Sequence, residues 1–216
     1  MRRIHIPSAL RPSRVRPFLV ALIMVSPTLL AAQGEDLAPR TTGRADAPIV
    51  IYEMSDFQCP YCRQFALETM PGLAREYVAT GKVRFVFINL PMASIHRHAI
   101  LAAEVGLCAA RLGKFWPVHD LLFKRQQEWS SRDNPQAYLI ALADSAGASR
   151  TRVAPCVTSH ATRPGVDADR AAATRAGAAA TPTFYIEGGL IDGAAPLEDF
   201  RAVLDSIYRV KTAAAR

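Results

Sequence analysis

The sequence predicts an α/β fold in which a strand–helix–strand unit is followed by a block of helices, a β-hairpin and a final helix. A first strand is expected at 49–54, where the residues are almost continuously apolar and β-prone. A second strand is expected at 83–90, after a helix. Between 95 and 177 the apolar residues recur at helical spacing. This order predicts one α/β domain that carries an all-helical insertion.

The helix after the first strand begins at the sequence CPYC, residues 59–62. Pro60 suits the first helical position, because the N–H that it lacks would have no partner there. We expect Pro71 and Gly72 to kink this helix and Gly81 to end it. Both cysteines therefore lie at the start of the helix in the strand–helix–strand unit.

Glycine and proline divide the rest of the chain into helices and a hairpin. Five helical segments are expected in the insertion: 97–112, one from about 117, 135–146, a short one around 153–157, and 166–176. Two β-prone runs, 183–186 and 190–192, flank a Glu-Gly-Gly turn and predict the hairpin. Apolar residues at helical spacing after position 196 predict the final helix.

The N-terminus has the pattern of a secretory signal peptide. A basic stretch ends at Arg16, an apolar stretch begins at Phe18, and small residues Ala31 and Ala32 stand where cleavage is expected. An uncleaved membrane anchor is the alternative, although the apolar run is short for a span of about 20 residues. Three parts are expected: a signal peptide at 1–32, a flexible lead-in at 33–47, and the α/β domain at 48–216 with its helical insertion at about 95–177.

The charge distribution does not indicate nucleic-acid binding. The net charge is +7, but five of the 26 basic residues lie within the expected signal, which has no acidic residue. The 21 basic residues that remain are balanced by 19 acidic ones and form no basic patch. We therefore expect no nucleic-acid partner.

The CPYC sequence predicts a redox-active pair of thiols. Disulfide exchange needs one thiol that readily becomes a thiolate and a second thiol that resolves the mixed disulfide. Cys59, at a helix N-terminus, has free backbone N–H groups and the helix dipole nearby, and both favour a negative charge. Cys62 lies one turn further on. We expect Cys59 to be the nucleophile and Cys62 the resolving thiol.

Other interpretations of this pair fit the sequence less well. A structural zinc site needs two more ligands, usually as a second close pair, and Cys108 and Cys156 are far apart. A c-type haem site needs histidine after the second cysteine, where Arg63 stands. A purely structural disulfide is the remaining alternative. We expect no metal and no cofactor.

Two further positions stand out beside the expected strands. Glu53 lies inside the first strand, where a buried carboxylate is costly without a role or a partner. We expect it either to lie behind Cys62 and exchange protons with that thiol, or to be paired or exposed at a sheet edge. Thr181 and Pro182 precede the third strand, and from the residues alone Pro182 marks an ordinary turn.

Three motifs together resemble the DsbA-like thioredoxin family of exported bacterial oxidoreductases. Within roughly residues 45–210 they are DFQCPYC at 56–62, GKFWPVHD at 113–120 and TPTF at 181–184. The resemblance implies a thioredoxin-like fold with an all-helical insertion, in which Cys59 attacks and Cys62 resolves. It also implies that the peptide bond before Pro182 is cis, that this proline faces the disulfide, and that Glu53 is the family's buried acid.

The resemblance also predicts how substrate is bound and leaves the direction of transfer open. Pro60, Tyr61, Thr181 and Pro182 are expected to form the substrate-binding surface, with Thr181 binding through its backbone. DsbA itself carries a histidine where this chain has Tyr61, and tyrosine supplies no positive charge to stabilise a thiolate. We expect an oxidase rather than an isomerase or reductase. The sequence by itself does not decide the direction of electron transfer.

Cys108 and Cys156 are predicted to form a structural disulfide. Cys108 lies on the inward line of one expected insertion helix, and Cys156 lies on a later, shorter one. The chain-entropy model gives about 4 kcal/mol for closing a loop of this size. The alternative is two buried free thiols that pack as small apolar side chains.

Several other residues are expected to be structural. We expect His96 and His98, at a helix start, to be a cap and a surface residue rather than metal ligands. His119 and the neighbouring Phe115 and Trp116 are expected to pack in the core rather than to act in catalysis or substrate binding.

These observations predict an exported thiol:disulfide oxidoreductase that acts in protein folding, in the periplasm or another extracytoplasmic space. Its partners would be exported proteins with thiols or disulfides, and a membrane redox partner of the DsbB or VKOR type, or a membrane reductase. We expect a monomer, since the short lead-in leaves no room for a preceding dimerisation domain. The alternative is a holdase chaperone or peptide-binding module whose disulfide does not cycle.

Overall fold

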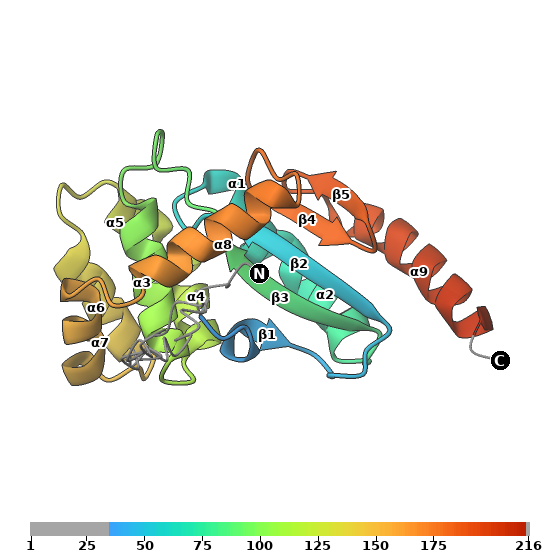
Figure 1. Ribbon diagram of the computed structural model, residues 1–216, viewed down its shortest axis with the longest axis horizontal. Helices are drawn as coiled ribbons and strands as arrows, with labels where there is room; N and C mark the ends of the chain where they lie inside the picture. Colours follow the sequence, from blue (N-terminus) through green and yellow to red (C-terminus); the bar gives the residue numbers. More distant parts are fainter. Residues whose placement is uncertain (1–34, 215–216) are drawn as a thin grey trace, which may run out of the picture. The chain divides into compact units, whose positions relative to one another are not determined.

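The computed structural model describes residues 35–214, and the expected signal peptide lies outside them. Its centre is a five-stranded sheet in the order β1-β3-β2-β4-β5 (Figure 1). Strands β2 and β3 are parallel, and each other neighbouring pair is antiparallel. The strands are β1 (Thr41–Thr42), β2 (Ile49–Ser55), β3 (Val83–Asn89), β4 (Thr183–Ile186) and β5 (Gly189–Asp192).

Helices surround this sheet and form the block between β3 and β4, in the predicted order. Those outside the block are η1 (Ala38–Arg40), α1 (Pro60–Gln64), η2 (Phe65–Thr69), α2 (Met70–Leu73), η3 (Ala74–Val78) and α9 (Leu197–Ala214). The block contains α3 (Ala99–Ala110), α4 (Phe115–Lys124), α5 (Gln126–Ser130), α6 (Gln136–Ser145), α7 (Arg150–Thr158) and α8 (Arg163–Arg175). Within the described chain, no helix is both long and apolar enough to cross a membrane.

Alternating side chains of β2 face two different layers. Ile49 and Ile51 pack in a cluster with Phe65 of η2 and with residues of α9. Met54 packs in a separate cluster with residues of α8, which crosses this face of the sheet in Figure 1. By the same alternation, Glu53 lies on the side of the helix that begins with the CPYC sequence.

The predicted kink at Pro71 takes the form of wider helical turns. The chain is helical from Pro60 to Val78, but the segments η2 and η3, before and after α2, are π-helical. Proline has no N–H to donate to the carbonyl four residues earlier, and its ring clashes with that carbonyl. A π-helical turn next to the proline relieves both problems without ending the helix.

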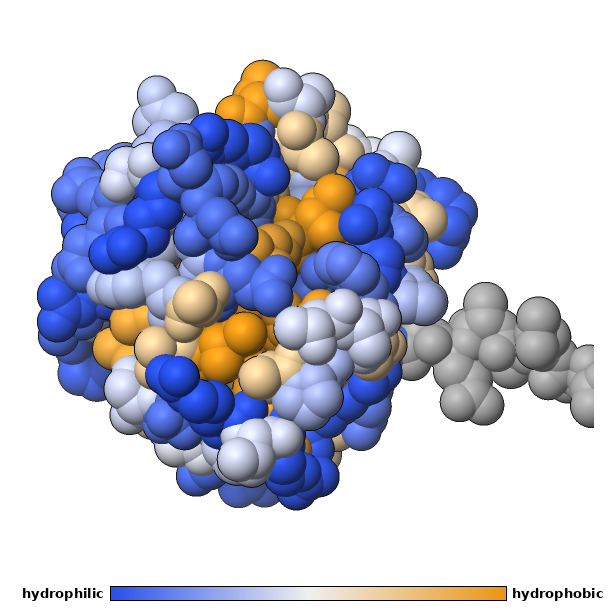
Figure 2. Space-filling model, turned by 90° about the vertical axis from the view of Figure 1, so that its left-hand side faces the viewer, coloured by the Kyte–Doolittle hydropathy of each residue, from blue (hydrophilic) through white to orange (hydrophobic). Residues whose placement is uncertain are grey.

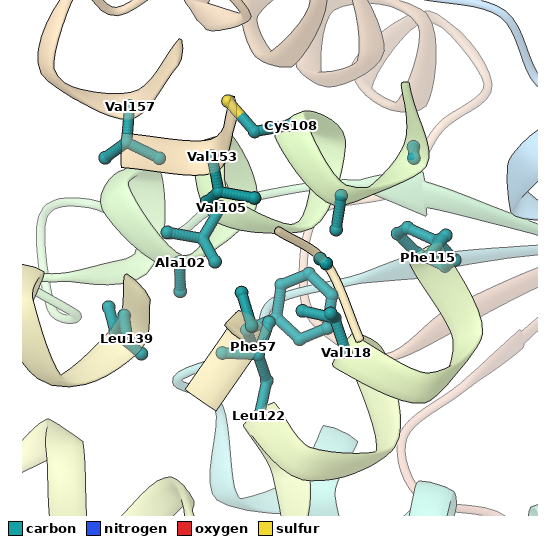
Figure 3. Close-up of a cluster of buried hydrophobic side chains, with 14 of the residues drawn as sticks. Phe57, Ala102, Val105, Cys108, Phe115, Val118, Leu122, Leu139, Val153 and Val157 are labelled. Carbon is teal, nitrogen blue, oxygen red and sulfur yellow. The ribbon is translucent and has the colours of Figure 1, made fainter. Parts of the chain in front are cut away.

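The helical block has its own core, which also holds the loop before the cysteines. Phe57, two residues before Cys59, inserts among side chains of α3, α4 and α6 (Figure 3). Its ring stacks on Phe87 of β3, with the centroids 5.0 Å apart. The outer surface of the block is mainly hydrophilic, with hydrophobic side chains in small patches between the polar ones (Figure 2). The cysteine loop is therefore fixed by packing on the insertion.

The described residues of the expected lead-in at 33–47 include the helical turn η1 and the strand β1. Strand β1 pairs with β3, and Arg40 is fully buried beside it. The Arg40 guanidinium pairs with the Asp169 carboxylate of α8, which also accepts hydrogen bonds from the backbone and side-chain N–H groups of Asn89, at 3.1 and 2.7 Å. A buried charge requires such partners, and the pair connects this segment to α8.

Replacing Arg40 with alanine is expected to lower the free energy of unfolding by about 3–5 kcal/mol, because it leaves Asp169 buried without its cation. Urea unfolding followed by circular dichroism would measure the change. Arg44→Ala is the matched control, since Arg44 pairs with Asp46 on the exposed surface and its loss should leave the unfolding midpoint almost unchanged. Equal effects of the two substitutions would contradict the role of the buried pair.

Candidate active site

The two cysteines of the CPYC sequence lie side by side at the start of α1. Cys59 is the N-cap residue, and Cys62 lies within the first turn. Both are free thiols and both are buried, with 5% of Cys59 and none of Cys62 exposed. The Cys59 Sγ donates to the carbonyl oxygen of Thr181 at 3.3 Å, and the Cys62 Sγ accepts the N–H of Asp56 at 3.4 Å. Cys59 is therefore the more accessible of the two sulfur atoms.

The surroundings drive the two thiol pKa values apart. The Cys62 thiol donates a hydrogen bond that stabilises the Cys59 thiolate, and the N–H groups of Cys62 and Tyr61 add to this, so the pKa of Cys59 falls to about 6. Burial raises the pKa of Cys62 well above its usual range, and the negative charges of Cys59 and Glu53 raise it further. Near neutral pH the pair therefore holds one thiolate, at Cys59, and one thiol, at Cys62.

Glu53 lies close enough to Cys62 for its charge to influence that thiol. The side chain is 1% exposed, and its Oε1 atom has no hydrogen-bond partner among the described residues. Burial raises the pKa of Glu53 to about 8, against a smaller opposing effect from Ser55. Glu53 therefore carries a proton at neutral pH.

The segment before β4 completes the site opposite Cys59. The Thr181–Pro182 peptide bond is cis, and Thr181 and Pro182 are both buried. Pro60 and Tyr61, which follow Cys59 in the chain, are exposed, with 62% of the tyrosine accessible. The contact of Cys59 with the Thr181 carbonyl thus brings together all four residues expected to bind substrate.

Polar side chains that the sequence did not single out hold the loop before Cys59 in place. The buried Asp56 carboxylate accepts hydrogen bonds from the N–H groups of Gln58 and Met92, at 2.7 and 2.9 Å. Gln126 of α5 donates to the carbonyl oxygens of Phe57 and Cys59, at 2.8 and 2.9 Å. The position of Asp56 within the DFQCPYC motif is the one feature of the sequence that could have indicated its role. The contacts of Gln126 come from far along the chain and have no local signature.

The three histidines considered above, His96, His98 and His119, have different surroundings in the structure. His119 packs among aromatic rings of the core, as predicted. His98 is the N-cap residue of α3 and is largely buried, with its Nε2 atom 2.8 Å from the carbonyl oxygen of Arg132. His98 and not His96 is thus the cap, and the expectation of a surface residue is wrong, because His98 is buried and the His96 ring is only 16% exposed and contacts the buried Asp56. Among the residues from 35 to 214, no group of three or more potential ligands forms a candidate metal site.

The second cysteine pair is joined by a disulfide that links α3 to α7. The Cys108 and Cys156 sulfur atoms are 1.99 Å apart, and the bond spans 48 residues of sequence. Thr162 lies beside it, with its hydroxyl 3.7 Å from the Cys108 Sγ and donating to the carbonyl oxygen of Glu104. The disulfide is thus embedded in the insertion, apart from the thiols of α1.

Comparison with known proteins places this chain in a family. Residues 35–206 match the family model described as thioredoxin. The Na(+)/H(+) antiporter NhaA 3 of Salinispora tropica is 30% identical over 166 residues, which make up 77% of this chain and 24% of the antiporter. Disulfide bond formation protein D of Bacillus subtilis is 33% identical over 92 residues, which make up 40% of this chain and 41% of that protein. The chain thus spans less than half the length of these relatives.

A solved structure shows the same fold. The crystal structure of alpha-DsbA1 from Wolbachia pipientis superposes with a TM-score of 0.73 at 19% sequence identity, and the match covers 82% of this chain and 94% of that one. At this identity the likeness concerns the fold. This chain belongs to the thioredoxin family and has the DsbA-like form of its fold.

Proposed function

We propose that this protein is a thiol:disulfide oxidoreductase that exchanges disulfides with exported proteins through Cys59 and Cys62. The observation that carries the proposal is the geometry at the start of α1, where two free thiols share the first turn and the Cys59 Sγ lies 3.3 Å from the Thr181 carbonyl oxygen. The pKa values of the two thiols support it, with Cys59 at about 6 and Cys62 well above its usual range. A low-pKa thiol is both a ready nucleophile and a good leaving group, and a protonated neighbour can resolve the mixed disulfide.

In the oxidising direction, a substrate thiolate attacks the Cys59 sulfur of the Cys59–Cys62 disulfide. The Cys62 sulfur leaves and takes up a proton, for which the protonated Glu53 is the nearby donor. A second substrate thiolate then attacks the substrate sulfur of the mixed disulfide and releases Cys59 as a thiolate. Two electrons pass from the substrate to the enzyme pair, and the substrate gains one disulfide.

The stabilised thiolate favours this oxidising direction. A thiolate that is stable in the reduced enzyme makes the enzyme disulfide a stronger oxidant. Tyr61 adds no charge, but the hydrogen bonds from Cys62 and from backbone N–H groups lower the pKa of Cys59 without it. The spent dithiol must then be reoxidised, so we propose a membrane partner of the DsbB or VKOR type.

Substrate recognition is proposed to use the backbone next to the reacting sulfur. The Thr181 carbonyl contacts Cys59, and the exposed Pro60 and Tyr61 follow Cys59 directly in the chain. An extended substrate segment can add a main-chain hydrogen bond there whatever its sequence, which suits an enzyme that acts on many clients. The disulfide between Cys108 and Cys156 supports an extracytoplasmic location, since such bonds persist in oxidising compartments.

Disulfide transfer to a reduced, unfolded client protein tests this function. The oxidised protein is mixed with the client, and free thiols on both are alkylated and counted by mass spectrometry over time. We expect the client to lose two thiols for each pair that appears at Cys59 and Cys62. Thiol counts that stay constant on both proteins would overturn the proposal and favour a peptide-binding module.

A further inference from the structure

We propose that His96 is a positioning residue for Cys59, and that its imidazolium, held on Asp56, supplies the positive charge that the CPYC sequence lacks. Its role rests on the proposed function, because it concerns the charge state of the nucleophile. His96 lies in the loop between β3 and α3, outside the three motifs that distinguish the family resemblance.

Asp56 connects this loop to both active-site cysteines. Its backbone N–H donates to the Cys62 Sγ at 3.4 Å, and its carbonyl oxygen accepts the N–H of Cys59 at 3.0 Å. Its side chain has no solvent exposure. A carboxylate so placed and so buried is a negative charge beside the forming Cys59 thiolate, and a like charge at short range raises the pKa of a thiol.

His96 is placed to cancel that charge. Its Nδ1 atom lies 2.7 Å from the Asp56 Oδ2, and the ring is 16% exposed. The loop on either side is fixed as well, because the N–H groups of Met92 and His98 donate to Asp56 and Gln58. The Asp56 carboxylate raises the pKa of His96 above its usual value, and a smaller contribution in the same direction comes from Cys59.

The charge balance of the site follows from these contacts. With His96 protonated, the ion pair with Asp56 is neutral as a unit, and the thiolate at Cys59 has no uncompensated anion next to it. With an uncharged residue at position 96, the Asp56 negative charge would act on the thiolate undiminished. His96 thereby does through Asp56 what a histidine between the two cysteines would do directly.

The test is the pKa of Cys59 in the reduced protein, measured from thiolate absorbance at 240 nm as a function of pH. His96→Asn keeps a donor for Asp56 but removes the charge, and it should raise the pKa of Cys59 by about one pH unit. This corresponds to about fivefold less thiolate at pH 6 if the starting pKa is about 6. His96→Lys, which restores a charge, should bring the value back toward that of the unmodified protein.

His160→Asn is the matched control. His160 also contacts a buried carboxylate, that of Glu104 at 3.0 Å, but beside the disulfide of the insertion, so its loss should leave the pKa of Cys59 unchanged. If His96→Asn folds and leaves the pKa of Cys59 unchanged, His96 only holds the loop and the proposal is overturned. The proposal is also overturned if His96→Asn and His96→Lys raise the pKa of Cys59 by the same amount. The titration uses no client, so its outcome is independent of whether disulfide transfer occurs.

Discussion

Replacing Cys59 with serine is expected to abolish disulfide transfer to client proteins, and replacing Cys62 with serine is expected to trap clients in mixed disulfides. Serine cannot take part in thiol–disulfide exchange, and Cys62 is completely buried and protonated, so it cannot replace Cys59 as the attacking group. In the Cys62→Ser variant the low-pKa thiol is still present, but nothing resolves the adduct it forms. Non-reducing gels and mass spectrometry with an oxidised client would detect the adduct.

The same pair of variants separates the oxidoreductase from a binding module. A chaperone that uses the surface around Tyr61 and Pro182 without redox turnover would protect a client from aggregation equally well with serine at position 59. If Cys59→Ser kept its disulfide-transfer activity, or if Cys62→Ser formed no adduct with Cys59, the assignment of nucleophile and resolving thiol would be wrong.

Replacing Glu53 with glutamine is expected to slow disulfide transfer by about 100-fold near neutral pH, the lower end of what a positioned general acid contributes. Glutamine has nearly the same shape but cannot deliver a proton to the Cys62 sulfur as it leaves. The pKa of Glu53 is about 8, so the group holds its proton below that pH and loses it above. The ratio of the transfer rate of the unmodified protein to that of Glu53→Gln should therefore fall as the pH rises through 8. Stopped-flow fluorescence from pH 6 to pH 9 would measure this ratio.

Glu104→Gln is the control for this substitution. Glu104 is also 1% exposed, but it pairs with His160 near the other disulfide and has no contact with the α1 thiols. Its replacement should leave the transfer rate of the folded protein unchanged at every pH. An unchanged rate for Glu53→Gln across the same range would show that Cys62 obtains its proton from elsewhere, for example from water.

The elements with strong periodicity were predictable from the sequence because their residues face a single kind of environment. Strand β2 is buried on one face and partly buried on the other, so its residues form a nearly continuous apolar run, and α9 shows one apolar stripe. Strand β1 has only two residues and no pattern of its own. It exists because Arg40 beside it is fixed by Asp169, 129 residues later in the sequence, which no local signal reveals.

The reactive residues of the candidate site were predictable from the sequence, but the residues that hold them in position were not. The position of Cys59 and Cys62 at a helix start follows from the CPYC sequence itself. The conformation at Pro182 was expected only from the family resemblance, since from the residues alone the proline marks an ordinary turn. His96 reaches Asp56 across 40 residues of sequence, and such contacts depend on how β3 and the following loop pack.

The reduction potential of the Cys59–Cys62 couple tests the central claim most directly. The protein is equilibrated in glutathione buffers of known potential, and the thiols are trapped and counted by mass spectrometry. The pKa of Cys59, about 6, lies between the values of about 7 for thioredoxin and about 3.5 for DsbA. We therefore predict a potential less negative than the value of about −270 mV for thioredoxin and displaced toward the value of about −120 mV for DsbA. A pair that does not cycle reversibly would contradict a thiol:disulfide oxidoreductase, and a potential in the range of about −200 to −270 mV would indicate a reducing or isomerising role instead of an oxidising one.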